Sequence, residues 1–500
     1  MRILKIIFLC LTAALVLSVF TACGGDSGNA GQNSGENVDE NSENAPENQN
    51  PEENQAEVKI LPDLPEVNYD GYKFTVLSMT DENEYERDDF WAEEFTGEII
   101  NDAKYARNLY VEDKYGVNIS TVNIGNFSMG NGTGTLRREI SAGDFGYDAA
   151  VLSVFDAANS TTNSLLMDLN DMPMLDLSKP WWDQRANEEL AIRGRMFFTT
   201  GDISAAMGGS IWVTAFNKKL LQEYSIEDPY ALVKSGNWTY DKLTELSRMV
   251  SEDLNGDGIM NQYDRFGITA ADDIIQAVIN ATGEKCAVIN AGGDIELSIL
   301  NERTIAAYEK IAELIWDADV MFQFQRISDE TGPSMFEHDQ ALFMPGLFRH
   351  VVELRTMETD FGILPMPKLD ESQSEYYSSV NTWWALFTCV PALQENPERT
   401  AVILEALAAE SRYTVRPAYY EKSLIGKHIR DDESEEMLDI IYETRTYDFG
   451  WYYQIGGFDM GLVNIMRANS GTFISTVERA MGRVERDIER INNLFNEFID

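Results

Sequence analysis

Short apolar runs alternate along the chain with longer stretches in which apolar residues recur every three or four positions. Runs at 72–79, 117–124, 147–153, 196–200 and 211–216 predict strands. Between the first two, residues 101–115 predict a helix, which Gly116 closes at a position typical of a C-terminal cap. A strand, a helix and further strands in this order predict a parallel or mixed sheet covered by helices.

Three later helices have clear N-terminal signals. Thr239 and Asn301 each precede an apolar stripe with helical spacing, and both residue types favour N-caps. Asn396 is followed by Pro397, and proline is favoured at the first helical position. We expect this third helix to end near Ser411.

The last helix is predicted to be the longest, and its apolar positions alternate spacings of four and three. These positions are Val477, Met481, Val484, Ile488, Ile491, Phe495 and Phe498. Such a heptad stripe favours either a coiled-coil dimer or a long helix docked on its own domain. Because the stripe is short and its residues differ in size, we expect docking and a monomer.

The N-terminal residues have the pattern of an export signal. An apolar run at 6–19 follows Arg2 and Lys5 and leads into Phe-Thr-Ala-Cys at 20–23. The run is shorter than the roughly 20 residues that span a bilayer. It resembles the bacterial lipoprotein signal, although Phe20 stands where Leu is usual. The resemblance implies a signal peptide at 1–22 and a lipid on Cys23 that anchors the protein to the outer face of the cell membrane. The alternative is an ordinary signal peptide.

Residues 23–65 are predicted to form a disordered acidic and polar tether. The segment is rich in Asn, Glu, Gly, Ser and Gln and almost free of aromatic residues. Such a composition buries too little apolar surface to offset the entropy of ordering the chain. We expect folding to start near Val67.

Composition excludes several classes of function. A formal net charge of −45 disfavours nucleic acid and anionic lipid headgroups as partners. The three histidines form no paired-His motif, so a zinc hydrolase is not expected. Apart from Cys10 and Cys23, the cysteines are Cys286 and Cys389, which we expect to be buried thiols; a disulfide between them is the alternative.

Residues 253–264 (DLNGDGIMNQYD) are similar to an EF-hand calcium loop. Oxygen ligands fall at positions 1, 3, 5 and 9, a glycine falls at position 6, and position 7 would give its backbone carbonyl. Position 12 is Asp rather than the usual, longer Glu. We therefore expect a structural Ca²⁺ ion, and the alternative is a metal-free turn. The ligands would be Asp253, Asn255, Asp257, Ile259, Asn261 and Asp264.

Aromatic residues occur in unusual doublets and triplets, at 181–182, 383–384 and 451–453. Aromatic faces stack on the CH faces of sugar rings, and nearby polar groups bind hydroxyls, so the pattern is typical of a carbohydrate site. Core packing is the alternative for any one tryptophan, and we expect one residue of each doublet to be core. Trp238, before the cap at Thr239, is expected to be structural.

Several segments resemble bacterial extracellular solute-binding proteins. They are GNWTYD at 236–241, AFNK at 215–218, QALFM at 340–344 and FGILPMP at 361–367, and their order and spacing also match. The resemblance covers about residues 72–500 and implies an α/β fold, the two-lobe type II periplasmic-binding fold of the maltodextrin-binding proteins, with a hinge and a ligand cleft between the lobes. By analogy, the chain should cross between lobes near Asn217, Val380 and Arg412. These crossings give an N-terminal lobe at 66–217 plus 380–412 and a C-terminal lobe at 218–379 plus 413–500.

Site residues do not transfer by motif, so we chose candidates from the crossings and from side-chain chemistry. Ligands in such sheets bind outside the carboxyl ends of strands. The candidates for substrate binding are Asp156, Trp182, Asp183, Arg349, Trp383, Trp384 and Tyr452.

The resemblance implies a substrate-binding lipoprotein of an ABC importer. Such a protein is not an enzyme: it captures a sugar or oligosaccharide and delivers it to the permease subunits in the membrane. Two alternatives remain open at this point. A cell-surface glycosidase would need two carboxylates at a set separation, and a calcium-dependent adhesion module would use residues 253–264.

Overall fold

A computed structural model describes residues 59–79, 90–125, 129–144, 146–324, 332–354, 357–419, 432–469 and 472–497. Residues Lys59–Asp500 form one compact unit. The predicted signal peptide, Cys23 and the tether as far as residue 58 lie outside the described residues. No helix in the described part of the chain is long and apolar enough to cross a bilayer.

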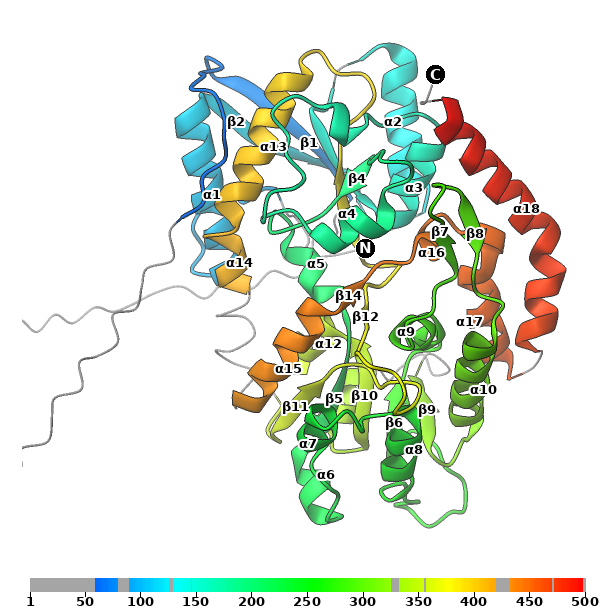
Figure 1. Cartoon of the computed structure of the whole chain (residues 1–500). Coiled ribbons are helices and arrows are strands. Elements are labelled where there is room, and N and C mark those ends of the chain that lie inside the picture. Colours follow the sequence, from blue (N-terminus) through cyan, green and yellow to red (C-terminus); the bar gives the residue numbers. More distant parts are fainter. Residues whose placement is uncertain are drawn as a thin grey trace, which may run out of the picture. The chain divides into compact units, whose positions relative to one another are not determined.

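Two five-stranded sheets, each covered by helices, organise this unit (Figure 1). The order in the first is β2-β1-β3-β13-β4, and in the second β11-β5-β10-β6-β9. The strands of the first sheet are β1 Tyr72–Ser78, β2 Val117–Asn123, β3 Ala149–Ser153, β4 Phe198–Thr199 and β13 Leu386–Cys389. The strands of the second are β5 Trp212–Asn217, β6 Phe266–Ala270, β9 Met321–Gln323, β10 Ala341–Leu347 and β11 Phe361–Leu364.

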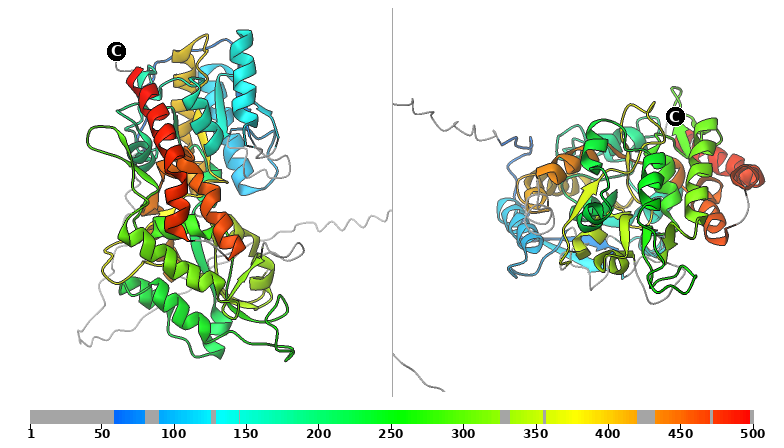
Figure 2. Two further views of the ribbon diagram at one scale, coloured as in Figure 1. Left: turned by 90° about the vertical axis from the view of Figure 1, so that its right-hand side faces the viewer. Right: turned by 90° about the horizontal axis from the view of Figure 1, so that it is seen from below.

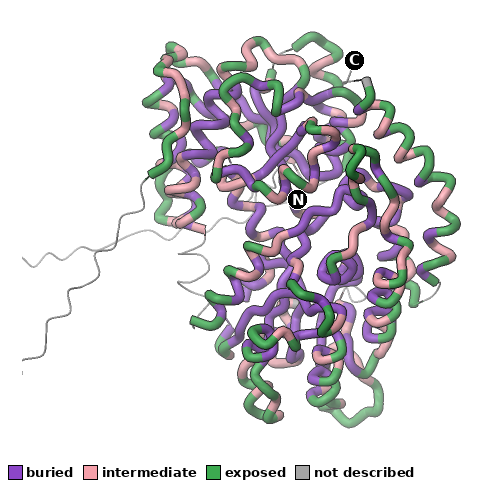
Figure 3. The backbone as a smooth tube through the Cα atoms, viewed as in Figure 1, coloured by how far each residue is buried: buried purple, intermediate pink, exposed green. Residues whose placement is uncertain are grey.

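Both sheets are mixed. In the first, β1 lies parallel to β2 and β3, whereas β13 runs antiparallel to β3 and β4. In the second, β10 and β9 are parallel to β6, and β5 is antiparallel to β10 and β11. The predicted α/β class is therefore confirmed. Figure 3 shows the buried backbone concentrated within and around the two sheets.

Helices with short connections cover both sheets. Those of the first lobe are α1 Ile99–Tyr115, α2 Asn131–Ala142, α3 Val154–Thr162, α4 Gln184–Leu190, α13 Pro397–Ser411 and α14 Val415–Pro417, with the 3-10 turn η2 Leu169–Asp171. Those of the second are α6 Lys218–Glu223, α7 Pro229–Lys234, α8 Tyr240–Arg248, α9 Ile274–Ala281, α10 Glu302–Trp316, α11 Gly332–Glu337, α12 Phe348–Glu353 and α15 Asp432–Glu443. α16 Phe449–Tyr452, the 3-10 turn η6 Ile455–Gly457, α17 Phe458–Ala468 and α18 Phe473–Glu497 follow α15.

The predicted caps are confirmed. Thr239, Asn301 and Asn396 each accept a backbone N–H of the first turn through the side-chain oxygen. Gly116 ends α1 at φ 63°, in the left-handed region that favours glycine. α13 ends at Ser411, as expected.

The chain crosses between the sheets earlier than predicted. We expected the first crossing near Asn217, but β5 already pairs with β10 and β11 in the second sheet. The crossing therefore lies between β4 and β5 and carries the short helix α5 Ala205–Gly209. The return crossing runs beside it, because Ile211 bridges Val380, at the position expected for that crossing. Two-stranded pairs complete the topology: β7 Ala287–Ile289 with β8 Ile295–Leu297, and β12 Ser378–Ser379 with β14 Arg445–Thr446.

Residues before Val67, where we expected folding to start, already contact the first lobe. Lys59 forms an ion pair with Glu410 at 2.8 Å, and the backbone N–H of Ile60 donates to the Tyr413 hydroxyl at 2.7 Å. Residues from 59 onward are thus bound to α13 and the turn after it, so the predicted tether extends too far. The Lys59 ammonium also lies over the Tyr110 and Tyr413 rings, which adds cation–π attraction. The amino-acid composition of the segment does not reveal these contacts.

Candidate functional site

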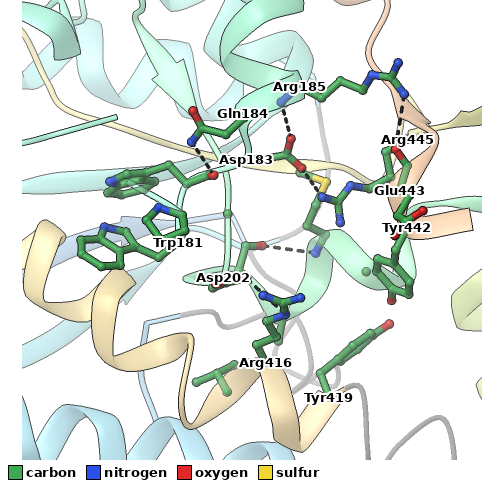
Figure 4. Close-up of a pocket in the computed structure, with 18 of the residues that line it drawn as sticks. Trp181, Asp183, Gln184, Arg185, Asp202, Arg416, Tyr419, Tyr442, Glu443 and Arg445 are labelled. Carbon is green, nitrogen blue, oxygen red and sulfur yellow. Dashed lines mark hydrogen bonds and ion pairs between the residues drawn. The ribbon is translucent and has the colours of Figure 1, made fainter. Parts of the chain in front are cut away.

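A pocket of about 530 Å³ lies where three chain segments from both lobes meet (Figure 4). One wall is the loop at 180–185 together with residues 201–208, from the first lobe and its crossing. The second is α14 with Tyr419, and the third is the C-terminal end of α15 with β14. Val415 fixes α14 to the first lobe, since it packs in a small apolar cluster with Ile100 and Ala205.

Asp183 lines this pocket, and two sets of contacts fix the position of its carboxylate. One carboxylate oxygen caps α4 by accepting the backbone N–H groups of Arg185 and Ala186, at 3.0 Å each. The other accepts from the Tyr447 hydroxyl and from the Arg445 guanidinium, both at 2.8 Å. The carboxylate is buried, and all of its charge faces donors, so it holds β14 against the first lobe.

Asp202 is a second carboxylate on the same wall, and it faces two arginines. It accepts from Arg412 at 3.2 Å and lies 3.8 Å from Arg416. Burial raises the pKa of Asp202, and the charges of Arg416 and Arg412 oppose that rise. Arg416 itself is about half exposed toward the pocket, so it is available to a ligand.

Two tyrosines form the opposite wall, and a glycine permits their close approach. A Cβ at Gly208 would lie 2.3 Å from Tyr419 Cε1 and 2.9 Å from the Tyr442 hydroxyl. A side chain at this position would therefore push the rings into the cavity. Burial raises the pKa of Tyr442, so its hydroxyl stays protonated at neutral pH.

The lining of the pocket includes Trp181 and Trp182, although both side chains are almost fully buried. Both indoles are buried, and both N–H groups donate to Glu405 of α13, at 3.1 and 2.8 Å. Burial raises the pKa of Glu405 from its ordinary value of 4.5 to about 7. In this conformation Trp182 has almost no ring surface to offer to a ligand. Its structural role is to fix the loop that carries Asp183.

Arg349, Trp383 and Trp384, also predicted from the sequence, lie together near the carboxyl ends of β3 and β10. The Arg349 guanidinium sits 4.2 Å from the centre of a Trp384 ring, and Trp383 packs edge-on against Phe155 at 4.9 Å. Asn381 orients the doublet by accepting both of its backbone N–H groups. Both tryptophans are partly exposed.

This aromatic cluster adjoins the pocket across α5. A Cβ at Gly209 would lie 3.5 Å from both the Arg349 Cβ and the Tyr419 hydroxyl. Arg349 and Tyr419 thus flank the same residue of the crossing. The structure brings five predicted residues to this region: Trp182, Asp183, Arg349, Trp383 and Trp384.

Two other predicted residues have structural partners instead. Asp156 is fully buried and accepts the backbone N–H groups of Gly130 and Thr133, which ties α2 to α3. Tyr452 is buried, and its hydroxyl donates to the Val380 carbonyl at 3.2 Å. These contacts correct the assignment of both side chains to the surface of a cleft, because neither reaches the pocket.

Residues 253–264 form a loop held by its own side chains. Asp253 accepts backbone N–H groups from Gly256 and Gly258, and Asp264 accepts those of Leu254 and Asn261. The side chains of Asn255 and Asp257 accept the backbone N–H groups of Asp257 and Ile259, respectively. Within the described residues, no three His, Cys, Asp or Glu side chains gather in a way that could hold a metal ion. Calcium binding at this loop stays a prediction.

Sequence reasoning missed most of the pocket wall. Among the missed residues, seven have charged or aromatic side chains outside the 180–185 loop: Asp202, Arg416, Tyr419, Asp439, Tyr442, Glu443 and Arg445. A usable signal existed for two of them, since Arg416 and Tyr419 closely follow the crossing expected near Arg412. Of the others, Asp202 lies in the turn after β4, and the remaining four come from α15 and β14, where nothing local indicates a site. Cys286 and Cys389 are buried free thiols, as expected.

No family model matches the chain, and no curated protein matches it in sequence. Solved structures do match its fold. The ABC substrate-binding protein Lmo0181 from Listeria monocytogenes, in complex with cycloalternan, is 13% identical with a TM-score of 0.52, and the match covers 85% of this chain and 100% of that one.

Two further solved structures match to a similar extent. The maltose/maltodextrin-binding domain MalE from Bdellovibrio bacteriovorus, bound to maltotriose, is 15% identical with a TM-score of 0.54, covering 83% of this chain and 100% of that one. UgpB from Mycobacterium tuberculosis, in complex with glycerophosphocholine, is 14% identical with a TM-score of 0.57, covering 84% and 99%. At these identities the likeness establishes the fold: this chain has the two-lobe type II periplasmic-binding-protein fold.

Proposed function

We propose that this protein is the substrate-binding component of an ABC importer and that it captures a sugar or oligosaccharide between its lobes. The observation that carries the proposal is the position of the pocket. It lies beside the crossings, and both lobes contribute to its wall. Closure of the lobes about the crossings would enclose a ligand and change the surface presented to a permease.

The chemistry of the pocket supports a polyhydroxylated ligand. Carboxylate–guanidinium pairs at Asp183–Arg445 and Asp202–Arg416 place acceptors beside donors, which suits neighbouring hydroxyl groups. Tyr419 and Tyr442 supply aromatic surface of the kind that packs against sugar rings. Solved structures with this fold include proteins bound to maltotriose and cycloalternan.

A thermal-shift screen against mono- and oligosaccharides, followed by calorimetry on each hit, tests the proposal. We expect at least one sugar to bind reversibly and Tyr419→Ala to weaken that binding more than tenfold. Tyr263→Ala is the matched control, because Tyr263 is exposed on the 253–264 loop, away from the pocket. Chromatography of the bound sugar after long incubation decides against the glycosidase alternative if the sugar is recovered intact. A released fragment would favour that alternative.

We also propose that the mature protein is tethered to the outer face of the membrane through a lipid on Cys23. The support is the order of residue types at positions 1–23: basic residues come first, an apolar run follows, and small residues precede Cys23. Several acyl chains, at about 0.8 kcal/mol per buried CH₂, hold a chain on a bilayer without a spanning helix. Cys23→Ser should release the protein into the medium. If this variant stays in the membrane fraction, the lipid-anchor proposal is wrong.

A further inference from the structure

Two tight turns, one from each lobe, meet beside the end of α18. The turn at 192–195 belongs to the first lobe, and the turn between β7 and β8 belongs to the second. The Arg193 guanidinium donates to the Asp294 carboxylate and to the Gly293 carbonyl, the latter at 3.3 Å. It also contacts Asn496 of α18. Only 15% of the Arg193 side chain is exposed, so it is largely enclosed between the lobes.

Each of the two turns is fixed to its own lobe. At the base of the first turn, Arg195 pairs with Asp168 of the first lobe at 2.9 Å. At the base of the hairpin, Glu284 pairs with Arg303 of α10 in the second lobe at 3.3 Å. The turns therefore move with their lobes, and the contacts of Arg193 with the hairpin break when the lobes move apart at this point.

The backbone of Arg193 has a conformation that is unfavourable for its residue type. Its φ is 52°, and Gly194 beside it has φ 75°. A two-residue turn with two positive φ angles favours Asn, Asp or Gly at its first position, because a larger side chain is strained there. Strained residues of this kind persist where the surrounding structure holds them, and they cluster at ligand clamps and switch regions. Asn or Gly would relax this turn but would not reach Asp294.

The opposite turn is shaped to receive the Arg193 side chain. Gly293 has φ 83°, and a Cβ at this position would lie 2.7 Å from the Arg193 Cγ. Lys285, at the base of the same hairpin, also pairs with Glu189 of α4 at 2.7 Å. The hairpin thus meets the first lobe at two points, and at Arg193 the contact is made from a strained backbone.

Resting on the lobe movement in the proposed function, we infer that Arg193 is a latch between the lobes. Its contacts with Asp294, Gly293 and Asn496 form when the lobes are together, and they stabilise this arrangement relative to one in which the lobes are apart. A contact made in only one of two states shifts the equilibrium toward that state. The latch therefore raises the population of the arrangement that encloses a ligand.

Small-angle X-ray scattering of the purified protein without sugar tests the latch. Arg193→Gly removes the guanidinium and relieves the strain, because glycine readily adopts a positive φ. We expect a larger radius of gyration than in the wild type. Asp294→Ala removes the acceptor on the hairpin, leaves residue 193 unchanged, and should give a similar increase. Ser225→Gly is the matched control, since Ser225 is exposed and has φ 54° in the turn after α6.

Calorimetry with any sugar that binds gives a second measurement. Apparent affinity scales with the population of the binding-competent state, so Arg193→Gly should weaken binding roughly fivefold. Arg193 lies outside the described lining of the pocket, so a lost contact with the sugar does not account for such a loss. Ser225→Gly should bind sugar as the wild type does.

The outcomes separate the latch from the proposed function. An unchanged radius of gyration in both Arg193→Gly and Asp294→Ala overturns the inference. An equal increase in Ser225→Gly also overturns it, because relief of a positive φ would then be the cause. If melting curves show that Arg193→Gly does not fold, Asp294→Ala decides alone. If no sugar binds, the proposed function fails, and the scattering comparison still decides whether Arg193 holds the lobes together.

Discussion

A single buried carboxylate holds the loop at 180–185, which forms one wall of the pocket. Glu405 accepts both indole N–H groups of the Trp181–Trp182 doublet and a backbone N–H of Asp176 at 3.4 Å. These donors are neutral, so they offset only part of the cost of burying a charge. The pKa of Glu405 therefore rises to about 7, since burial outweighs the hydrogen bonds.

This shift predicts a pH dependence of stability. Between pH 4.5 and about 7 the folded protein holds a proton on Glu405 that the unfolded chain has lost, so the free energy of unfolding falls as the pH rises through this window. At about 1.36 kcal/mol per pKa unit, the loss is on the order of 3 kcal/mol. Denaturant unfolding at pH 5 and pH 8 should show a smaller loss for Glu405→Gln than for the wild type. Equal losses in both proteins would show that the pKa is not raised.

Gly208 is the second residue on which the pocket depends. Gly208→Ala places a methyl group against Tyr419 and Tyr442, so the rings must move into the cavity. We expect sugar affinity to fall more than tenfold and stability by about 1–3 kcal/mol, typical of overpacking. Gly134→Ala on α2 is the control, because its Cβ meets nothing closer than an Arg138 nitrogen at 3.9 Å. Calorimetry and melting curves on both variants check the prediction, which fails if Gly208→Ala binds as the wild type does.

Elements whose signals are local were predictable from the sequence. The caps at Thr239, Asn301 and Asn396 depend on residues within one turn, and all three are confirmed. Burial of Trp182 was not predictable, because its partner Glu405 lies 223 residues away. The sequence also did not indicate which sheet β5 joins. All six residues of β5 are buried, so no alternation of polar and apolar residues distinguishes the two faces of the strand.

The 253–264 loop is an element whose sequence and geometry point in different directions. Its spacing is similar to a calcium loop, yet its oxygens accept the amide groups of the loop itself. The buried Asp264 accepts two such groups, from Leu254 and Asn261. Calcium binding by these oxygens stays a prediction.

Melting curves recorded before and after removal of metal test the calcium prediction. An ion that binds only the folded protein adds about 2.7 kcal/mol at a hundredfold excess over its Kd. If calcium binds, a chelator lowers the melting temperature, added Ca²⁺ restores it, and Asp257→Ala abolishes the response. A melting curve that does not change after verified metal removal contradicts the calcium prediction.

At the scale of the whole unit, α18 runs along one side, from its start beside α10 and α17 to its end at the first lobe, as Figures 1 and 2 show. Near its start, Phe473 packs against Tyr308 of α10, with ring centroids 5.1 Å apart. Near its end, Phe495 meets Phe197 of the first lobe at 5.5 Å, and Asn496 contacts Arg193. The apolar stripe that also suggested a coiled coil is thus used within the chain, since Val477, Val484, Ile491 and Phe495 are buried.

The β7–β8 hairpin joins α18 in connecting the lobes. Arg193 of the first lobe binds Asp294 and the Gly293 carbonyl in the hairpin turn, and Asn492 of α18 accepts the backbone N–H of Ile295. The two lobes are therefore linked by these contacts as well as by the crossings. Such a link makes the unfolding of one lobe depend on the other.

Phe495→Ala tests this dependence. The ring is 1% exposed, so its removal should cost about 3–5 kcal/mol. Because the lost contact joins the lobes, we also expect calorimetric unfolding to separate from one transition into two. Ile474→Ala, at an exposed position of the same helix, should change stability by no more than about 0.5 kcal/mol and keep the single transition. If Phe495→Ala lowers the melting temperature but unfolding stays in one step, α18 stabilises the protein without coupling its lobes.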